Sequence, residues 1–158
     1  MKKELTIEKA KEISHEYLSK VEDKKLKEFL LVHSSKVSET AVLIGKIKKL
    51  DTEVLEIAGF IHDIGYSMNE QNHSQHSLNI LKKQNFEISE KLKDCILNHG
   101  VDGNPKTREG EIFQMADKIS IIDQDTLAVF LRDNQMTNEE KGFLEMMLSN
   151  SLKFLAKL

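Results

Sequence analysis

Apolar residues recur three or four positions apart along almost the whole chain, and this spacing constrains the fold more than any other feature of the sequence. Because one helical turn holds 3.6 residues, such spacing gathers apolar side chains on one face of an α-helix. No stretch of useful length alternates apolar and polar residues as a half-buried strand would. One proline and seven glycines are too few for a sandwich with many tight turns. The pattern therefore predicts an all-α fold.

We expect a compact bundle of about six to eight helices. Apolar periodicity and capping residues place them at about residues 7–21, 26–44, 52–62, 73–84, 90–99 and 108–119, with a further turn or two over 126–133 and a last helix over 138–155. Thr137 with Glu140 three positions later forms a capping box before that last helix. The other expected helix starts are caps at Thr6, Asn72, Ser89 and Thr107, and the expected stops are Gly65, as a left-handed cap, and Gly100.

The composition limits the class of protein. The chain has 158 residues and a net charge of 23 − 26 = −3, which favours one soluble globular domain over 1–158 and gives no basic surface for nucleic acid. No apolar run approaches the roughly 20 residues that span a bilayer, and no apolar segment of a signal peptide follows the N-terminal lysines. Cys95 is alone and cannot form a disulfide within the chain. We therefore expect a cytoplasmic protein without a membrane partner.

The histidines are unevenly placed: five of the six lie between positions 33 and 99. His33, His62 and His99 each fall on the apolar face of a different predicted helix, and His73 begins the helix between the last two. A lone histidine in such a position is usually a core residue with one hydrogen bond. Several imidazoles turned inward together, with Asp63 directly after His62, need a shared partner, and a metal ion supplies one.

The residue types also indicate which metal is suitable. Asp117, on a later predicted helix, adds a second carboxylate, and imidazoles with carboxylates but no thiolates suit first-row ions rather than a cysteine-rich structural zinc site. We expect one or two divalent ions, with iron or manganese favoured over zinc, cobalt, nickel and magnesium. Cys95 precedes His99 by four residues, and ordinary core packing is the favoured interpretation of this lone cysteine. His15 lies outside every such pattern and is expected at the surface.

Five segments resemble, in order and spacing, the HD-domain superfamily of metal-dependent phosphohydrolases. They are HSSKVSETA from position 33, AGFIHDIGY from 58, HSQHSLNIL from 73, ILNHG from 96 and MADKIS from 115. The similarity covers about residues 26–123, and HDIG places the chain near a subgroup of small bacterial and archaeal proteins. The resemblance implies a helical HD domain with the N-terminal and C-terminal helices packed on this core.

The resemblance also implies roles for individual residues. The first metal ion would be held by His33, His62, Asp63 and Asp117. The second would be held by His73 and His99, with Asp63 bridging the two ions. His73 is preferred to His76 because a small residue and an aliphatic residue follow it four and eight positions later, as in the family. The residues expected at the catalytic centre, where a metal-activated hydroxide would attack a phosphoester, are His62, Asp63, His73 and His99.

Substrate contacts are expected beside these ligands. Lys106 and Arg108 lie between His99 and the helix of Asp117, and Lys118 follows that aspartate directly, although each could equally be a solvated surface charge. His76 is either behind the ligands, a substrate contact or exposed. Tyr66 stands where many HD hydrolases have a lysine that contacts phosphate. Its ring instead offers a hydroxyl donor and a surface on which a nucleobase could stack.

Three functions remain open at this point. The first is hydrolysis of a small phosphoester, with a nucleotide or dinucleotide favoured as substrate. The second is a di-iron oxygenase, since a minority branch of the superfamily uses the same ligand set for oxygen chemistry. The third is a metal-binding or nucleotide-binding module without catalysis. The methionine-rich C-terminal segment, EMMLSNSLKFLAKL, packs either on the core or on a second copy of the chain, which leaves a homodimer open.

Overall fold

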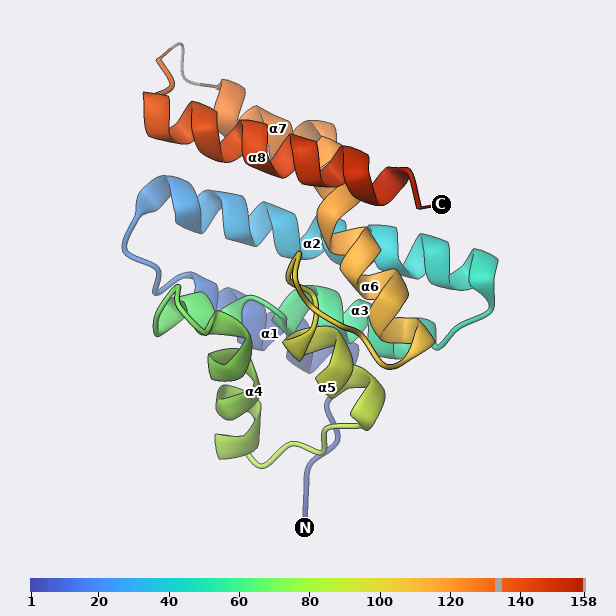
Figure 1. Cartoon of the computed structure of the whole chain (residues 1–158). Helices are drawn as coiled ribbons and strands as arrows, with labels where there is room; N and C mark the ends of the chain where they lie inside the picture. The colour runs from blue at the N-terminus through green and yellow to red at the C-terminus, as the bar shows by residue number, and fades with distance from the viewer. Residues whose placement is uncertain (133–134, 158) are drawn as a thin grey trace.

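The computed structural model describes residues 1–132 and 135–157. Eight α-helices and two short 3₁₀ helices form within these ranges, as the sequence predicts for an all-α protein (Figure 1). They are α1 (Ile7–Leu18), α2 (Lys24–Lys48), α3 (Thr52–Ile61), η1 (Ile64–Ser67), α4 (His73–Lys83), α5 (Glu90–Leu97), α6 (Arg108–Ile119), η2 (Ser120–Ile122), α7 (Gln124–Leu131) and α8 (Asn138–Leu155).

The predicted helix starts are confirmed by hydrogen bonds at four of the five capping residues. The hydroxyls of Thr6, Ser89 and Thr107 each accept a bond from the backbone N–H three residues later, at 3.2, 3.2 and 2.9 Å. Thr137 and Glu140 form the expected capping box, with both of its reciprocal bonds present. Each cap satisfies an N–H group that has no partner within its helix, which fixes where the helix begins.

Other boundaries differ from the prediction. Asn72 precedes α4 in the left-handed region, with φ of 60°, but its side chain makes no capping bond. Gly65 is not a left-handed cap, because no described glycine has a positive φ. A side chain at Gly65 would instead overlap the His73 carbonyl oxygen and lie 2.7 Å from the Ser77 nitrogen, so this glycine allows η1 to touch α4. The helix before Gly100 already ends at Leu97, and the helix predicted over 126–133 ends at Leu131; Asp133 lies outside the described residues.

Helix α2 runs through the middle of the molecule (Figure 1). α7 and α8 lie on one side of it, and α3 lies on the other with α1, α4 and α5, while α6 connects the two sides. A close crossing joins α2 to α3, where a side chain at Gly59 would fall 2.6 Å from the backbone nitrogen of Ser38. This crossing brings the middle of α2 against the end of α3.

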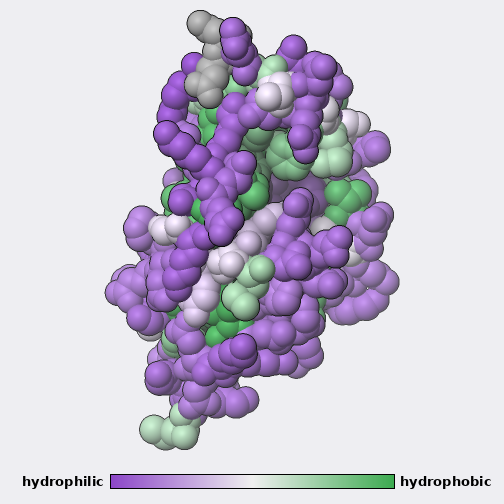
Figure 2. Space-filling model, turned by 90° about the vertical axis from the view of Figure 1, so that its left-hand side faces the viewer, coloured by the Kyte–Doolittle hydropathy of each residue, from purple (hydrophilic) through white to green (hydrophobic). Residues whose placement is uncertain are grey.

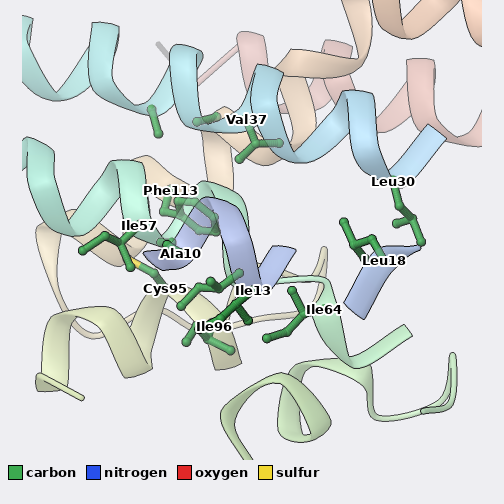
Figure 3. Packing of buried hydrophobic residues seen from close by; sticks show 14 of the residues in the cluster. Ala10, Ile13, Leu18, Leu30, Val37, Ile57, Ile64, Cys95, Ile96 and Phe113 are labelled. Atoms are coloured by element: carbon green, nitrogen blue, oxygen red, sulfur yellow. The ribbon is translucent and has the colours of Figure 1, made fainter. Parts of the chain in front are cut away.

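One hydrophobic core holds the eight described α-helices together, and α8 contributes Leu144 to it. Figure 3 shows part of this core, in which Ile13 from α1 lies close to Ile96 from α5, and Val37 from α2 and Phe113 from α6 belong to the same cluster. Cys95 is fully buried in this core, as expected for ordinary packing. The face in Figure 2 is mostly hydrophilic, and hydrophobic residues gather around a hollow in its upper half. Within residues 1–132 and 135–157, no helix has the length and apolarity to cross a membrane.

Helix α8 buries less apolar surface than the sequence predicts. Leu144, Ser151 and Phe154 are buried, but Leu152 is 65% exposed and Leu155 is 37% exposed. Apolar residues occupy almost every side of this helix, so periodicity alone does not identify the face that packs on α6 and η2.

Candidate metal centre

Helix ends position most of the predicted ligands. Two of them lie within helices, His33 in α2 and Asp117 in α6. The other four lie at or beside helix ends: His62 and Asp63 follow α3, His73 begins α4, and His99 lies two residues after α5. All lie within hydrogen-bonding range of another member of the set. Residues up to 84 positions apart in sequence are thus brought to one point.

Three of the histidines are oriented by the same local bond. The Nδ1 atoms of His62, His73 and His99 each bond to the backbone carbonyl three residues earlier in the chain. These carbonyls belong to Gly59, Glu70 and Ile96, at 3.0, 3.0 and 2.7 Å. A carbonyl oxygen can only accept, so the Nδ1 atom carries the proton and the Nε2 lone pair points into the site. This is the orientation that metal-binding imidazoles adopt.

Asp63 divides the histidines into two groups with its two carboxylate oxygens. Oδ2 lies 3.1 Å from Nε2 of His62 and 4.0 Å from Nε2 of His33. Oδ1 lies 3.3 Å from Nε2 of His73 and 3.4 Å from Nε2 of His99. A single carboxylate therefore faces two adjoining positions, each with nitrogen atoms converging on it.

Asp117 completes the first of these positions. Its Oδ1 atom lies 2.9 Å from Nε2 of His33 and 3.4 Å from Nε2 of His62. Its Oδ2 atom accepts a bond from the ammonium group of Lys118. The His33 ring is held by a stack on Phe29, with centroids 5.0 Å apart and planes at 16°.

The electrostatics of the site favour positive charge between the carboxylates. Burial opposes ionisation of Asp63 and Asp117. The neighbouring His62 nevertheless holds the pKa of the Asp63 carboxyl well below its usual range. Lys118, followed by His33, does the same for the pKa of Asp117. Burial likewise opposes protonation of His62, yet the two carboxylates raise its pKa above the usual value. The pKa of His99 is lowered, because burial and the nearby His62 outweigh its hydrogen bond to Asp63.

Unsatisfied atoms test whether a metal ion fits this arrangement. His62 Nε2 and Asp63 Oδ1 are buried and have no hydrogen-bond partner, a costly condition in a protein interior. The Nε2 atoms of His73 and His99 are 3.1 Å apart, and with both protons at Nδ1 two lone pairs face each other. A cation bound at each position would satisfy all four atoms, so the residues fit one or two divalent ions with nitrogen and oxygen ligands.

An open cleft of about 190 Å³ adjoins the metal centre. Five of the six predicted ligands line it on one side together with Tyr66, and α8 lines the other. The Tyr66 ring stacks on His73, with centroids 4.3 Å apart and planes at 28°. His62, in contrast, is fully buried behind the cleft. The remaining lining residues are Phe29, Gly100, Val101, Lys118, Ile121, Phe143, Met146, Met147 and Asn150.

The predicted substrate contacts separate into two groups. Tyr66 and Lys118 line the cleft, and their contact with a substrate stays a prediction. Lys106 and Arg108 are exposed and do not line the cleft, and His76 is half-buried outside it. The structure brings none of these three to the cleft, so their roles rest on sequence position alone. His15 is exposed, as expected.

Two contributions to the site are not predicted by the sequence. Ser77 donates a bond to the His62 carbonyl at 2.7 Å and accepts one from the Gly65 N–H at 2.8 Å, which fixes the HDIG turn against α4. The second contribution comes from α8, whose Phe143, Met147 and neighbouring residues line the cleft. Its richness in methionine was the only signal, and that pattern is equally typical of a core helix.

Together, the fold and the cluster define an all-α protein with buried histidine and aspartate residues suited to metal binding. The model of the HD domain family matches residues 30–122, more than half of the chain. The chain therefore belongs to the HD domain family.

Two curated proteins have similar sequences. A deoxyguanosinetriphosphate triphosphohydrolase-like protein from Caldanaerobacter subterraneus is 27% identical over an alignment of 114 residues; the match covers 60% of this chain and 34% of that protein. Ribonuclease Y from Desulforamulus reducens is 27% identical over an alignment of 121 residues; the match covers 73% of this chain and 24% of that protein. The chain thus spans about a third and a quarter of the lengths of these relatives.

A solved structure has the same fold. The crystal structure of a predicted HD superfamily hydrolase from an uncultured Thermotogales bacterium superposes with a TM-score of 0.60. The match covers 92% of this chain and 88% of the other, at 23% sequence identity. At that identity, the likeness supports the fold alone.

Proposed function

We propose that the protein is a metal-dependent phosphohydrolase that cleaves a small phosphoester. The observation that carries the proposal is the position of Asp63, whose two oxygens face two adjoining groups of histidine nitrogens beside an open cleft. Divalent ions held there would supply a nucleophile at neutral pH and positive charge opposite phosphoryl oxygens. The printed name of the Caldanaerobacter relative, a triphosphohydrolase-like protein, is in keeping with this reaction class.

The chain's own residues have distinct parts in the proposed reaction. Bonds to backbone carbonyls keep the histidine Nε2 lone pairs directed into the site. The ammonium group of Lys118 lies beside Asp117 at the cleft, and in this proposal it binds a phosphate oxygen. Water attacks phosphorus, the P–O bond to the alcohol breaks, and the alcohol leaves with a proton. A nucleotide or dinucleotide is the substrate class favoured by the family resemblance.

A panel of phosphomonoesters, phosphodiesters and nucleotides tests the proposal on protein loaded with manganese or iron. We expect hydrolysis of at least one member, and loss of that activity in Asp63→Asn. Asp23→Asn is the matched control, because Asp23 caps α2 far from the site and asparagine caps a helix equally well. Hydrolysis that persists in Asp63→Asn would contradict the proposal.

An iron-dependent oxygenase is the second candidate. The observation in its favour is the Tyr66 ring, which stacks on His73. At this position many HD hydrolases have a lysine that contacts phosphate, and tyrosine carries no such positive charge. Oxygen uptake on substrate addition, by protein containing iron that changes oxidation state, would favour this candidate over hydrolysis.

A further inference from the structure

The cleft has two walls of opposite chemical character. The wall formed by η1, α4 and the residues around His99 and Asp117 carries the predicted metal ligands. The opposite wall comes largely from α8, where Phe143, Met146 and Met147 lie, together with Ile121 of η2. Since the family match ends at residue 122, α8 belongs to the part of this chain that the family model does not cover.

A buried hydroxyl fixes the position of α8 over the cleft. Ser151 is fully buried and donates to the backbone carbonyl of Lys118 on α6. The same hydroxyl is 2.9 Å from the Met147 carbonyl within α8. Met147 and Asn150, which both line the cleft, lie within one turn of this anchor. The apolar wall is therefore held at a set position relative to Asp117 and Lys118.

Charge limits what the cleft can take. Among the described residues that line it, Lys118 is the only lysine or arginine, and its ammonium group is already shared with Asp117. A polyphosphate chain carries charge on every phosphate group, and the apolar wall offers no partner for the groups beyond the first. A volume of about 190 Å³ is also below the roughly 300–1,000 Å³ of sites that enclose drug-sized ligands.

We propose that α8 selects substrates in which one phosphate group is esterified to a compact aromatic alcohol, over polyphosphates and over esters of polar alcohols. This inference rests on the proposed hydrolysis of a phosphoester, and it favours a different alcohol from the nucleotide or dinucleotide that the family resemblance implies. The phosphate faces the metal centre and Lys118, and the aromatic group lies against the methionine and phenylalanine side chains of α8. Methionine sulfur and aromatic rings make favourable contacts, and apolar surface removed from water adds to binding.

Binding of two phosphonates to the manganese-loaded protein tests the inference without any turnover. Phenylphosphonate and methylphosphonate share the same anionic group and differ in the aromatic ring. By isothermal titration calorimetry we expect phenylphosphonate to bind at least tenfold more tightly. Inorganic tripolyphosphate, titrated with manganese in excess, should bind no more tightly than inorganic phosphate.

Two variants of α8 distinguish the effect of losing an apolar side chain in the cleft from the effect of changing α8 elsewhere. Met146 is 52% exposed and lines the cleft, whereas Leu152 is 65% exposed and does not line it. Met146→Ser should reduce the preference for phenylphosphonate at least threefold and leave methylphosphonate binding unchanged, while Leu152→Ser should change neither. Equal binding of the two phosphonates, absence of binding by both, or tighter binding of tripolyphosphate would overturn the inference. Preference for phenylphosphonate without hydrolysis of any ester would support it and refute the hydrolase proposal.

Discussion

Replacing Gly65 with alanine tests the close contact that places His73 opposite Asp63. The added methyl group would overlap the His73 carbonyl oxygen and lie 2.7 Å from Ser77 N and 2.8 Å from the His73 carbonyl carbon. All three atoms belong to the backbone of α4, so neither side can yield by changing a rotamer. The variant can fold only if η1 and α4 move apart.

The cost can be worked from these contacts. Overpacking at a tight backbone contact costs about 1–3 kcal/mol. Separation of η1 from α4 also weakens the 2.8 Å bond from Gly65 N–H to the Ser77 hydroxyl, which adds about 1 kcal/mol. We expect Gly65→Ala to lower the free energy of unfolding by about 2–4 kcal/mol. Displacement of His73 should also remove one of two bound metal ions, because that histidine contacts Asp63 Oδ1 but not Asp117.

Urea denaturation with a chelator present measures the change in the free energy of unfolding without a contribution from the metal. A metal ion that binds only the folded state would otherwise add to the apparent stability. Metal content per chain measures the second effect. Gly142→Ala is the control, because no atom lies within 4 Å of a side chain added at this exposed position in α8. That change should stabilise the protein by about 0.5–1 kcal/mol. Unchanged stability and unchanged metal content in Gly65→Ala would refute the reasoning.

Three further predictions concern other residues. Asp63→Ala should remove the metal while circular dichroism shows unchanged helix content, and full metal occupancy in that variant would contradict the bridging role. Asp94→Asn should cost about 2–3 kcal/mol in urea denaturation at pH 6, because the Asp94 carboxylate accepts bonds from Lys106 N–H, Thr107 N–H and the Thr107 hydroxyl at 2.9, 2.7 and 2.7 Å. Burial alone would raise the pKa of Asp94, but the bonds from Thr107, Lys106 and Asn98 lower it below the usual 3.8. The stability difference between the natural protein and Asp94→Asn should therefore be full above pH 3.8 and shrink as the pH falls through the folded-state pKa. A stability difference that grows on acidification would contradict this expectation. Thr137→Ala should lower the free energy of unfolding by about 1 kcal/mol through loss of the α8 capping box, whereas Thr137→Ser, which keeps the hydroxyl, should not.

The sequence predicts the helices and most of their starts because these depend on local features. Thr107 and Thr137 find their hydrogen-bond partners within three residues, so a short segment contains all the information. Gly65 shows the opposite case. Its position after α3 is typical of a left-handed cap, but the contact that requires glycine is with α4, and only the packed structure shows it.

In the candidate site, too, some residues can be predicted from the sequence and others only from the packed structure. The candidate ligands are indicated by histidines on apolar helix faces and by the family resemblance, and the structure brings all six residues together. The cleft residues on α8 could not be predicted in the same way, because α8 is apolar on nearly every side and its inward face is set by contacts with α6. Lys106 and Arg108 illustrate the converse error, since nearness in sequence to His99 and Asp117 does not place them at the cleft.

The most direct test of the account is the number of metal ions bound per chain, measured by elemental analysis of the purified, untagged protein beside its His73→Ala variant. The geometry around Asp63 predicts about two ions in the natural protein and about one in the variant, because His33, His62, Asp63 and Asp117 would still hold the first. A single ion in both proteins would confine the site to those four residues. Absence of metal from the natural protein, even after incubation with manganese or iron, would contradict the account.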